Sequence, residues 1–228
     1  MTLSSAQIFA CLYATWPAAE IKQSGAWTFR KTPGGGNRVN AATRIDDAKE
    51  VPEASLVMVR AGQPGLDQAL AHAGYLKRDA TLALALKVPN TPVPPPLVTT
   101  FLGWEPLEAH RRVWAEDGIG PDRVEVMSRA KVPKTSILGR LDDKPVGVGF
   151  VGAHKDVAMV HALSVLPSQR RKGLAKFMMQ RAMVWAHAQK CDYLSVLVTE
   201  DNQPARALYT ALGFQPVTSY HYRAEGET

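Results

Sequence analysis

The chain has 228 residues, which is enough for one large domain or two small ones. Its 27 lysines and arginines outnumber its 21 aspartates and glutamates, and the formal net charge of +6 favours anionic partners such as nucleic acids or a phosphate-rich cofactor. Cys11 and Cys191 lack the Cys and His spacing of a zinc site, and no apolar stretch approaches the roughly 20 residues of a membrane span, so we predict a metal-free cytoplasmic protein.

The first half of the sequence predicts short helices alternating with strands. Apolar residues recur at helical spacing from Ile8 to Trp16. The patterns that follow predict strands at 27–30 and 56–60, a helix at 68–74 and a strand at 80–88. Three glycines stand at 34–36 without the Gly-Lys-Ser/Thr ending of a phosphate-binding P-loop, so we expect a hairpin loop there.

Proline is dense between residues 89 and 96. Such a run cannot lie inside a helix or a central strand, because proline lacks the backbone N–H that both structures use. We therefore predict a linker, with a smaller N-terminal α/β domain at 1–96 and a second domain at 97–228.

The second half predicts one crossover unit of strand, basic turn, helix and strand. In chain order we expect a helix at 105–116, strands at 136–141, 144–153 and 157–165, a helix at 174–190, a strand at 193–199, a helix at 204–212 and a last strand at 215–223. The helix between 157–165 and 193–199 implies that these two strands run parallel.

A basic turn precedes the long predicted helix. The first turn of a helix presents backbone N–H groups without internal partners, which makes it a natural anion site. Arg170, Arg171 and Lys172 add full positive charges where the helix dipole prefers acidic groups, and a bound polyanion would reverse that penalty. Charge and geometry alone leave open the alternative of a solvated basic helix start.

Two strings resemble motifs of the GNAT (GCN5-related N-acetyltransferase) superfamily. The string Arg170-Arg171-Lys172-Gly173-Leu174-Ala175 resembles the acetyl-CoA signature Q/R-x-x-G-x-G/A. The string from Asn202 to Phe214 resembles the motif N-x-x-A-x-x-L-Y-x-x-x-G-F. The resemblance covers about 97–223 and implies an α/β (α+β) fold with the mixed central sheet of acyl-CoA N-acyltransferases. It also implies an N-acetyltransferase that uses acetyl-CoA and needs no metal.

The resemblance further implies roles for individual residues. Arg170 and the backbone amides of residues 171–175 (Arg171, Lys172, Gly173, Leu174, Ala175) would hold the CoA pyrophosphate, and Leu163 and Val165 would pair with the pantetheine arm. Asn202 would hydrogen-bond the cofactor, and Tyr209 would protonate the departing thiolate. A thiolate leaves readily, since ordinary thiols have a pKa near 8.5, so one positioned hydroxyl donor is adequate. Core packing is the alternative for Tyr209.

The base that accepts the amine proton is not identified by a motif. His161 is one candidate, because the imidazole pKa suits neutral pH, and strand alternation places it on the same face as Leu163 and Val165. Glu200, at the end of the next strand, is another. Met159 stands where some family members carry a strand glutamate. Purely structural roles remain open for His161 and Glu200.

The N-terminal half has no counterpart of the basic turn. Residues 64–88 faintly resemble the closing helix and strands of the same fold, so we interpret this half as a degenerate GNAT-like domain or as an unrelated α/β extension. Trp16, Trp27 and Trp104 are candidates for lining an acceptor pocket, although large aromatic residues more often belong to a core.

We predict an acetyltransferase acting on a primary amine of a small molecule or peptide, as a monomer or homodimer. One alternative is a CoA-binding regulatory homologue without turnover. Another is a nucleic-acid-binding module, which the net charge suggests but the localised basic turn disfavours.

Overall fold

The computed structural model describes residues 2–226. Its helices are α1 Ser5–Thr15, α2 Pro64–His72, α3 Glu108–Glu116, α4 Pro121–Arg129, α5 Leu174–Ala188 and α6 Gln203–Ala211. Its strands are β1 Glu20–Ser24, β2 Trp27–Lys31, β3 Leu56–Arg60, β4 Leu76–Lys87, β5 Thr100–Gly103, β6 Lys134–Leu141, β7 Lys144–His154, β8 Val157–Val165, β9 Tyr193–Thr199 and β10 Gln215–Ala224.

Eight of these strands form one mixed sheet in the order β3-β10-β4-β9-β8-β7-β6-β5, and β1 pairs with β2 in a separate hairpin. Within the large sheet only β8 and β9 run parallel, as the helical crossover between them predicts. The expected mixed α/β fold is therefore confirmed.

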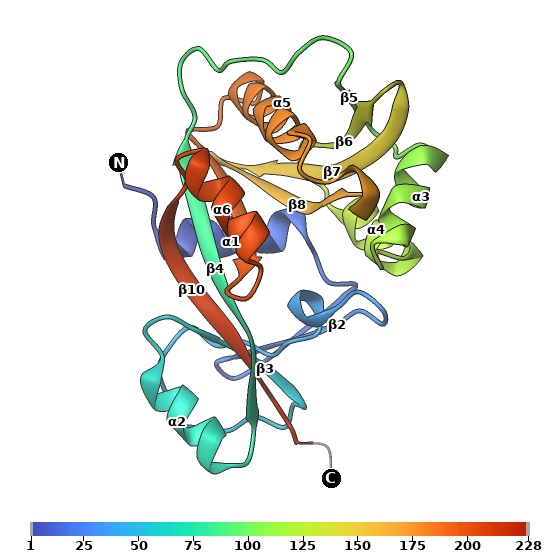
Figure 1. Cartoon of the computed structure of the whole chain (residues 1–228). Coiled ribbons are helices and arrows are strands. Elements are labelled where there is room, and N and C mark those ends of the chain that lie inside the picture. Colours follow the sequence, from blue (N-terminus) through green and yellow to red (C-terminus); the bar gives the residue numbers. More distant parts are fainter. Residues whose placement is uncertain (1, 227–228) are drawn as a thin grey trace.

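Helices cover the sheet on both faces (Figure 1). Residues of α1, α3, α4, β7 and β8 form one core cluster. The largest side chains of this cluster include Trp114, Phe150 and Met159. Residues of α5 and α6 share the opposite cluster, which contains Leu174, Met178 and Tyr209. The amphipathic stripe of α5 and the apolar face of α1 thus bury opposite sides of the same strands.

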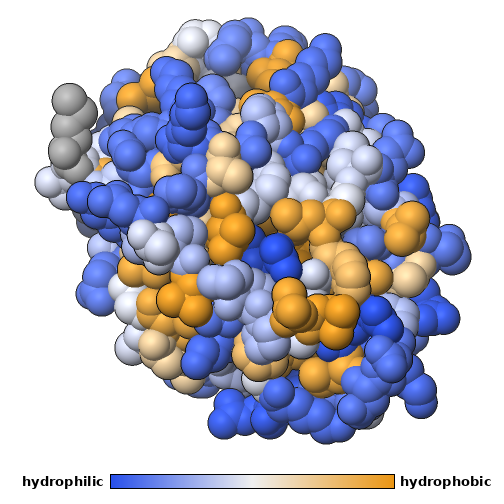
Figure 2. Space-filling view, turned by 90° about the horizontal axis from the view of Figure 1, so that it is seen from above, coloured by the Kyte–Doolittle hydropathy of each residue, from blue (hydrophilic) through white to orange (hydrophobic). Residues whose placement is uncertain are grey.

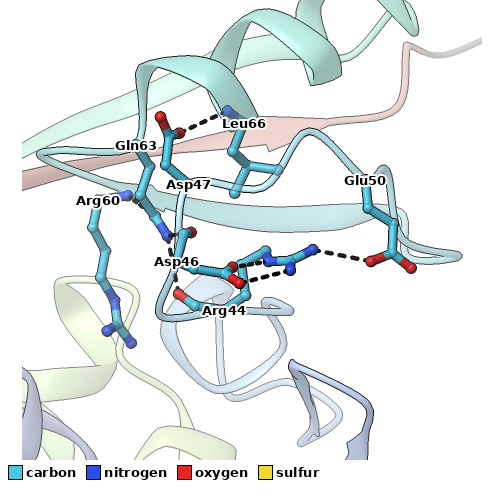
Figure 3. Close-up of polar contacts among 7 residues, drawn as sticks. All are labelled: Arg44, Asp46, Asp47, Glu50, Arg60, Gln63 and Leu66. Carbon is cyan, nitrogen blue, oxygen red and sulfur yellow. Dashed lines mark hydrogen bonds and ion pairs between the residues drawn. The ribbon is translucent and has the colours of Figure 1, made fainter.

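A third cluster packs α2 and the β1–β2 hairpin against β3, around Trp27, Leu66 and Leu70. The loop leading into β3 is held there by polar contacts (Figure 3). The buried Arg44 guanidinium pairs with Asp46 and, at 3.1 Å, with Glu50, and it lies over the Trp27 ring. Asp47 accepts hydrogen bonds from the first amides of α2, including Leu66 N at 2.9 Å, so an acidic side chain satisfies the helix start.

The two halves of the chain share the large sheet. Strand β4, from the first half, lies between β9 and β10 and is antiparallel to both. Figure 1 shows β4 and β10 running side by side from the part that carries α6 to the part that carries α2. The division of the chain at residue 96 stays a prediction, but the second half does not complete its sheet without β4.

Most predicted elements are confirmed within a few residues. Strands β8 and β9 have the predicted bounds, and α5 begins at the predicted Leu174. Three elements were missed, namely β1, β5 and α4. The predicted helix at 68–74 begins earlier, at Pro64, because proline is favourable in the first turn, where its missing N–H is not needed.

The proline-rich segment forms an irregular connection between β4 and β5. It exposes apolar side chains, including Val93, Leu97 and Val98. Figure 2 views the molecule from above, onto the end that carries this connection, and shows apolar groups separated by hydrophilic ones. Within residues 2–226, no helix combines the length and apolar character of a membrane-spanning segment.

Glycines in β6 and β7 let the helices approach the sheet closely. A Cβ atom at Gly152 would lie 2.7 Å from Thr15 Cγ2 and 2.8 Å from Thr15 Cβ of α1. We expect Gly152→Ala to lower the free energy of unfolding by about 1–3 kcal/mol, because overpacking forces the helix away from the strand. Urea unfolding measures the change. Gly103→Ala in β5 is the matched control, since a Cβ there meets no atom within 4 Å. Equal stability of the two variants would contradict close packing of α1 on β7.

Candidate functional site

The candidate site is a wedge between β8 and β9. Their parallel pairing runs from Val157 opposite Tyr193 to Val160 opposite Val196 and then stops. Beyond that point β8 continues to Val165 against β7, while β9 continues to Thr199 against β4. The facing edges of 161–165 and 197–199 are therefore left without a strand partner.

A β-bulge marks the point where the two strands separate. Two residues of β8, Ala162 and Leu163, stand opposite the single residue Gly149 of β7, and Ala162 has a φ of 50°. One extra residue reverses the alternation of side chains along the strand. The expectation that His161 shares a face with Leu163 and Val165 is therefore wrong. His161 packs on the α1 side, and the other two pack on the α5 side.

The basic turn lies at the wide end of the wedge. Gly173 is the N-cap of α5 in a left-handed conformation (φ 83°), and Arg171 also has a positive φ. Within the described chain, the backbone amides of residues 171–175 donate no hydrogen bond, and a Cβ at Gly173 would meet open space. An anion can thus approach a row of free N–H groups at the positive end of the helix dipole.

Two of the three basic side chains are engaged by the protein itself. Arg170 donates to the Val165 carbonyl at 2.9 Å and pairs with Asp117 at 3.0 Å, which ties the turn to the end of β8 and to the end of α3. Lys172 donates to the Gln169 side chain at 2.8 Å. The Arg171 side chain is exposed. This turn therefore presents a row of unpaired backbone amides in a positive field rather than a clamp of free cations.

Asn202 and Tyr209 lie on the helix that follows β9. Asn202 caps α6, since its Oδ1 accepts from Ala205 N at 3.1 Å. Tyr209 is buried on the α5 side and packs on Phe214. Burial raises the pKa of Tyr209 to about 12, while the nearby Arg38 charge acts in the opposite direction. The phenol is thus protonated at neutral pH and able to donate a hydrogen bond.

A cleft of about 350 Å³ opens at the wedge on the α1 side. Its walls include Ala162 from β8, Thr199 from β9 and Tyr220 from β10. The segment 35–38 and Trp16 close it from the first half of the chain. Of the three tryptophans considered for an acceptor pocket, only Trp16 lines this cleft, while Trp27 and Trp104 pack in apolar clusters.

His161 lies behind Trp16 in the core. Its ring stacks on Trp16 with centroids 4.9 Å apart, and its Nε2 lies 2.8 Å from Thr15 Oγ1. The Thr15 hydroxyl donates its one hydrogen to the Cys11 carbonyl at 2.7 Å. The Nε2–H of His161 therefore donates to Thr15 Oγ1. Burial, with a further contribution from Arg38, lowers the pKa of His161 well below its usual value.

Neither Glu200, the other candidate base, nor Met159, which stands where some family members carry a strand glutamate, lines this cleft. Met159 is fully buried in the cluster on the α1 face. Glu200 is exposed and lines a second cleft of about 410 Å³, which shares only Tyr220 with the first.

The first cleft is lined by three charged residues that were not predicted from the sequence, namely Arg38, Asp79 and Arg123. The glycine run at 34–36 was the available signal, because it lets the chain turn directly into Arg38.

Within residues 2–226, no group of three His, Cys, Asp or Glu side chains has the arrangement of a metal site. Cys11 and Cys191 are both buried free thiols.

Residues 102–214 match the family model described as "Acetyltransferase (GNAT) family". The chain is 25% identical over 236 residues to a protein of Bacillus subtilis (strain 168) named "Uncharacterized N-acetyltransferase YobR", covering 92% of this chain and 94% of YobR. It is 36% identical over 58 residues to the aminoglycoside N(6')-acetyltransferase type 1 of Acinetobacter baumannii, which is 25% of this chain and 40% of that enzyme.

Among solved structures, a GCN5-related N-acetyltransferase from Kribbella flavida superposes with a TM-score of 0.71 at 18% identity. The superposition covers 100% of this chain and 98% of that chain. The shared fold therefore extends over both halves, including β4.

The burial of His161 predicts a pH dependence of stability. Because its folded-state pKa lies below the value near 6.5 of the unfolded chain, stability is fully present above pH 6.5 and is lost as the pH falls below it. The loss reaches about 1.4 kcal/mol per pH unit for one histidine. We expect His161→Gln to show a shallower fall between pH 6.5 and 4.5 in urea unfolding. His110 and His221, whose pKa values are also lowered, remain in both proteins, so the difference isolates His161. Identical slopes would mean that His161 is protonated without cost in the folded protein.

Proposed function

This chain belongs to the GNAT acetyltransferase family, and on that premise we propose that it moves the acetyl group of acetyl-CoA to a primary amine. The observation that carries the proposal is the row of free amides at the start of α5, beside a strand edge that lacks a partner. A diphosphate suits the first feature, because it accepts several N–H groups at once. An extended amide-containing chain suits the second, because it can add to a free strand edge.

Different residues would bind different parts of the cofactor. Backbone amides of residues 171–175 would bind the pyrophosphate, with Arg170 fixing the turn in place. Leu163 and Val165 would pair with the pantetheine arm along the open edge of β8. Asn202, whose Oδ1 caps α6, would use its side-chain nitrogen toward the same ligand. The thioester would then lie in the wedge, between Tyr209 on one face and the cleft on the other.

Acetyl-CoA supplies a thioester that a neutral amine can attack directly, with formation of a C–N bond and breakage of the C–S bond. Tyr209 is the donor for the departing sulfur, since its hydroxyl is held protonated at neutral pH. Proton removal from the amine is assigned to water in the cleft. His161 donates its Nε2–H to Thr15 and resists protonation, so its role is to hold Trp16 and α1 in position.

The alternative is a CoA-binding regulatory homologue. It is favoured by one observation, namely that Met159 and the buried His161 leave β8 without an exposed base. It differs from the main proposal in one measurable respect, since a regulator binds acetyl-CoA without releasing free thiol in the presence of amines.

The cofactor site is tested by two substitutions of equal shape at Gly173. Asn and Asp both tolerate a left-handed conformation and differ mainly in charge. We expect wild type and Gly173→Asn to bind acetyl-CoA in calorimetric titration, and Gly173→Asp to bind about ten-fold or more weakly, because its carboxylate repels the pyrophosphate. Equal affinities of the two variants would remove the pyrophosphate from this turn. No binding by folded wild type would reject the proposed function.

The role of Tyr209 is tested by Tyr209→Phe, which keeps the packing on Phe214 and removes the hydroxyl. We expect kcat to fall by about 10²- to 10⁴-fold with unchanged affinity for acetyl-CoA and unchanged stability, since only the proton donor is lost. Release of free thiol with an accepted amine gives kcat, and calorimetry gives the affinity. A variant with wild-type kcat would leave Tyr209 as a packing residue.

A further inference from the structure

The cleft at the wedge contains an arginine that the protein does not neutralise. Arg38 lines the cleft, and its Nε donates to the Tyr220 hydroxyl at 3.2 Å. Among the described residues, no carboxylate lies within ion-pair distance of Arg38, and its two terminal nitrogens donate no hydrogen bond. Neither of these terminal nitrogens is fully buried.

Arg38 differs from the neighbouring arginines that also lack an ion pair. Arg30 lies over the Tyr13 ring at 4.0 Å, and Arg60 lies over the Phe9 ring at 4.2 Å, so an aromatic face partly satisfies each cation. In the part of the chain that the structure describes, Arg38 has no such ring contact. A partly buried guanidinium whose two terminal nitrogens have no protein partner is poorly satisfied until an anion binds, and a carboxylate fits these nitrogens with two parallel hydrogen bonds.

The other charges around the cleft point to the same kind of ligand. Arg123 also lines the cleft, and no ion pair is formed by it within residues 2–226. Asp79 lines the same cleft and accepts from Asn37 Nδ2 at 2.8 Å through one of its oxygens. The cleft therefore offers both signs of charge to a small zwitterion. Arg38 and Arg123 suit its carboxylate, and Asp79 suits its protonated amine, which loses its proton before it reacts.

We propose that the acceptor is a small amine that carries a carboxylate, such as an amino acid, and that Arg38 binds this carboxylate. The proposal rests on the acetyltransferase function proposed above and names the class of its acceptor. A cleft of about 350 Å³ suits a ligand of this size. The position of Ala162 and Thr199 in its walls brings the amine to the wedge, where the thioester would lie. Arg38 thereby gives the first half of the chain a direct part in substrate choice.

The test compares each acceptor with its own carboxamide. Wild-type protein and acetyl-CoA are incubated with a panel of α- and ω-amino acids and with the matching amides, and free thiol is measured. The amide keeps the side chain and the amine but loses the negative charge. Its amine also has a lower pKa, so a larger fraction is neutral at pH 7.5 and intrinsic reactivity favours the amide. A preference for the amino acid must therefore come from binding.

We expect at least one amino acid to be acetylated with a KM about 10- to 100-fold below that of its amide. Arg38→Gln should remove most of this difference and leave the affinity for acetyl-CoA unchanged, and Arg38→Lys should retain part of it, since lysine keeps the charge without the fork. Arg112→Gln, an exposed arginine of α3 outside the cleft, is the charge-matched control and should behave as wild type.

Three results would overturn the proposal. One is equal use of acids and amides by wild type, and another is absence of turnover with every amino acid of the panel while the matching amides are acetylated. The third is a loss of acetyl-CoA affinity in Arg38→Gln, which would assign this arginine to the cofactor. Failure of wild type to bind acetyl-CoA, or binding without release of free thiol with any amine of the panel, would instead reject the underlying acetyltransferase function, so the two failures are distinguishable.

Discussion

The separation of β8 from β9 is the constraint on which the site depends. Parallel pairing ends after Val160, and the bulge at Ala162 turns the remaining edge of β8 away from its neighbour. A sheet without this separation would satisfy its own backbone groups and offer nothing to a ligand. With it, β8 has a free edge that borders the cleft at Ala162 and leads along the chain to the turn with the free amides at the start of α5.

The same separation explains how groups on opposite faces of the sheet act on one another. Tyr209 belongs to the cluster under α5 and α6, whereas Arg38 reaches the cleft from the other face, yet each alters the pKa of the other. A continuous sheet would place a layer of backbone between them. In this chain the Tyr209 phenol and the Arg38 guanidinium lie near enough for each to alter the pKa of the other, as the proposed function requires of a leaving-group donor and an acceptor-binding residue.

The sequence predicted the features that depend on residues close together along the chain. The bounds of β8 and β9, the start of α5 and the two family motifs could be recognised in the sequence, and the match of residues 102–214 confirms the family. The face of His161 could not be predicted, because the bulge depends on the pairing of β8 with Gly149 in another strand. Arg38 was missed for a similar reason, since it becomes a cleft residue only when the segment after the glycine run folds against β10.

The place of β4 has a consequence for the order in which the chain can assemble during synthesis. The alternating apolar residues Leu82, Leu84 and Leu86 leave the ribosome early, whereas their partners in β9 and β10 are made near the end. Until then β4 has two unpaired edges, the condition under which strands bind to other chains. Long-range pairing of this kind also slows folding. The charged residues Lys77, Arg78 and Asp79 at the start of the strand would help to keep the waiting segment apart from its copies.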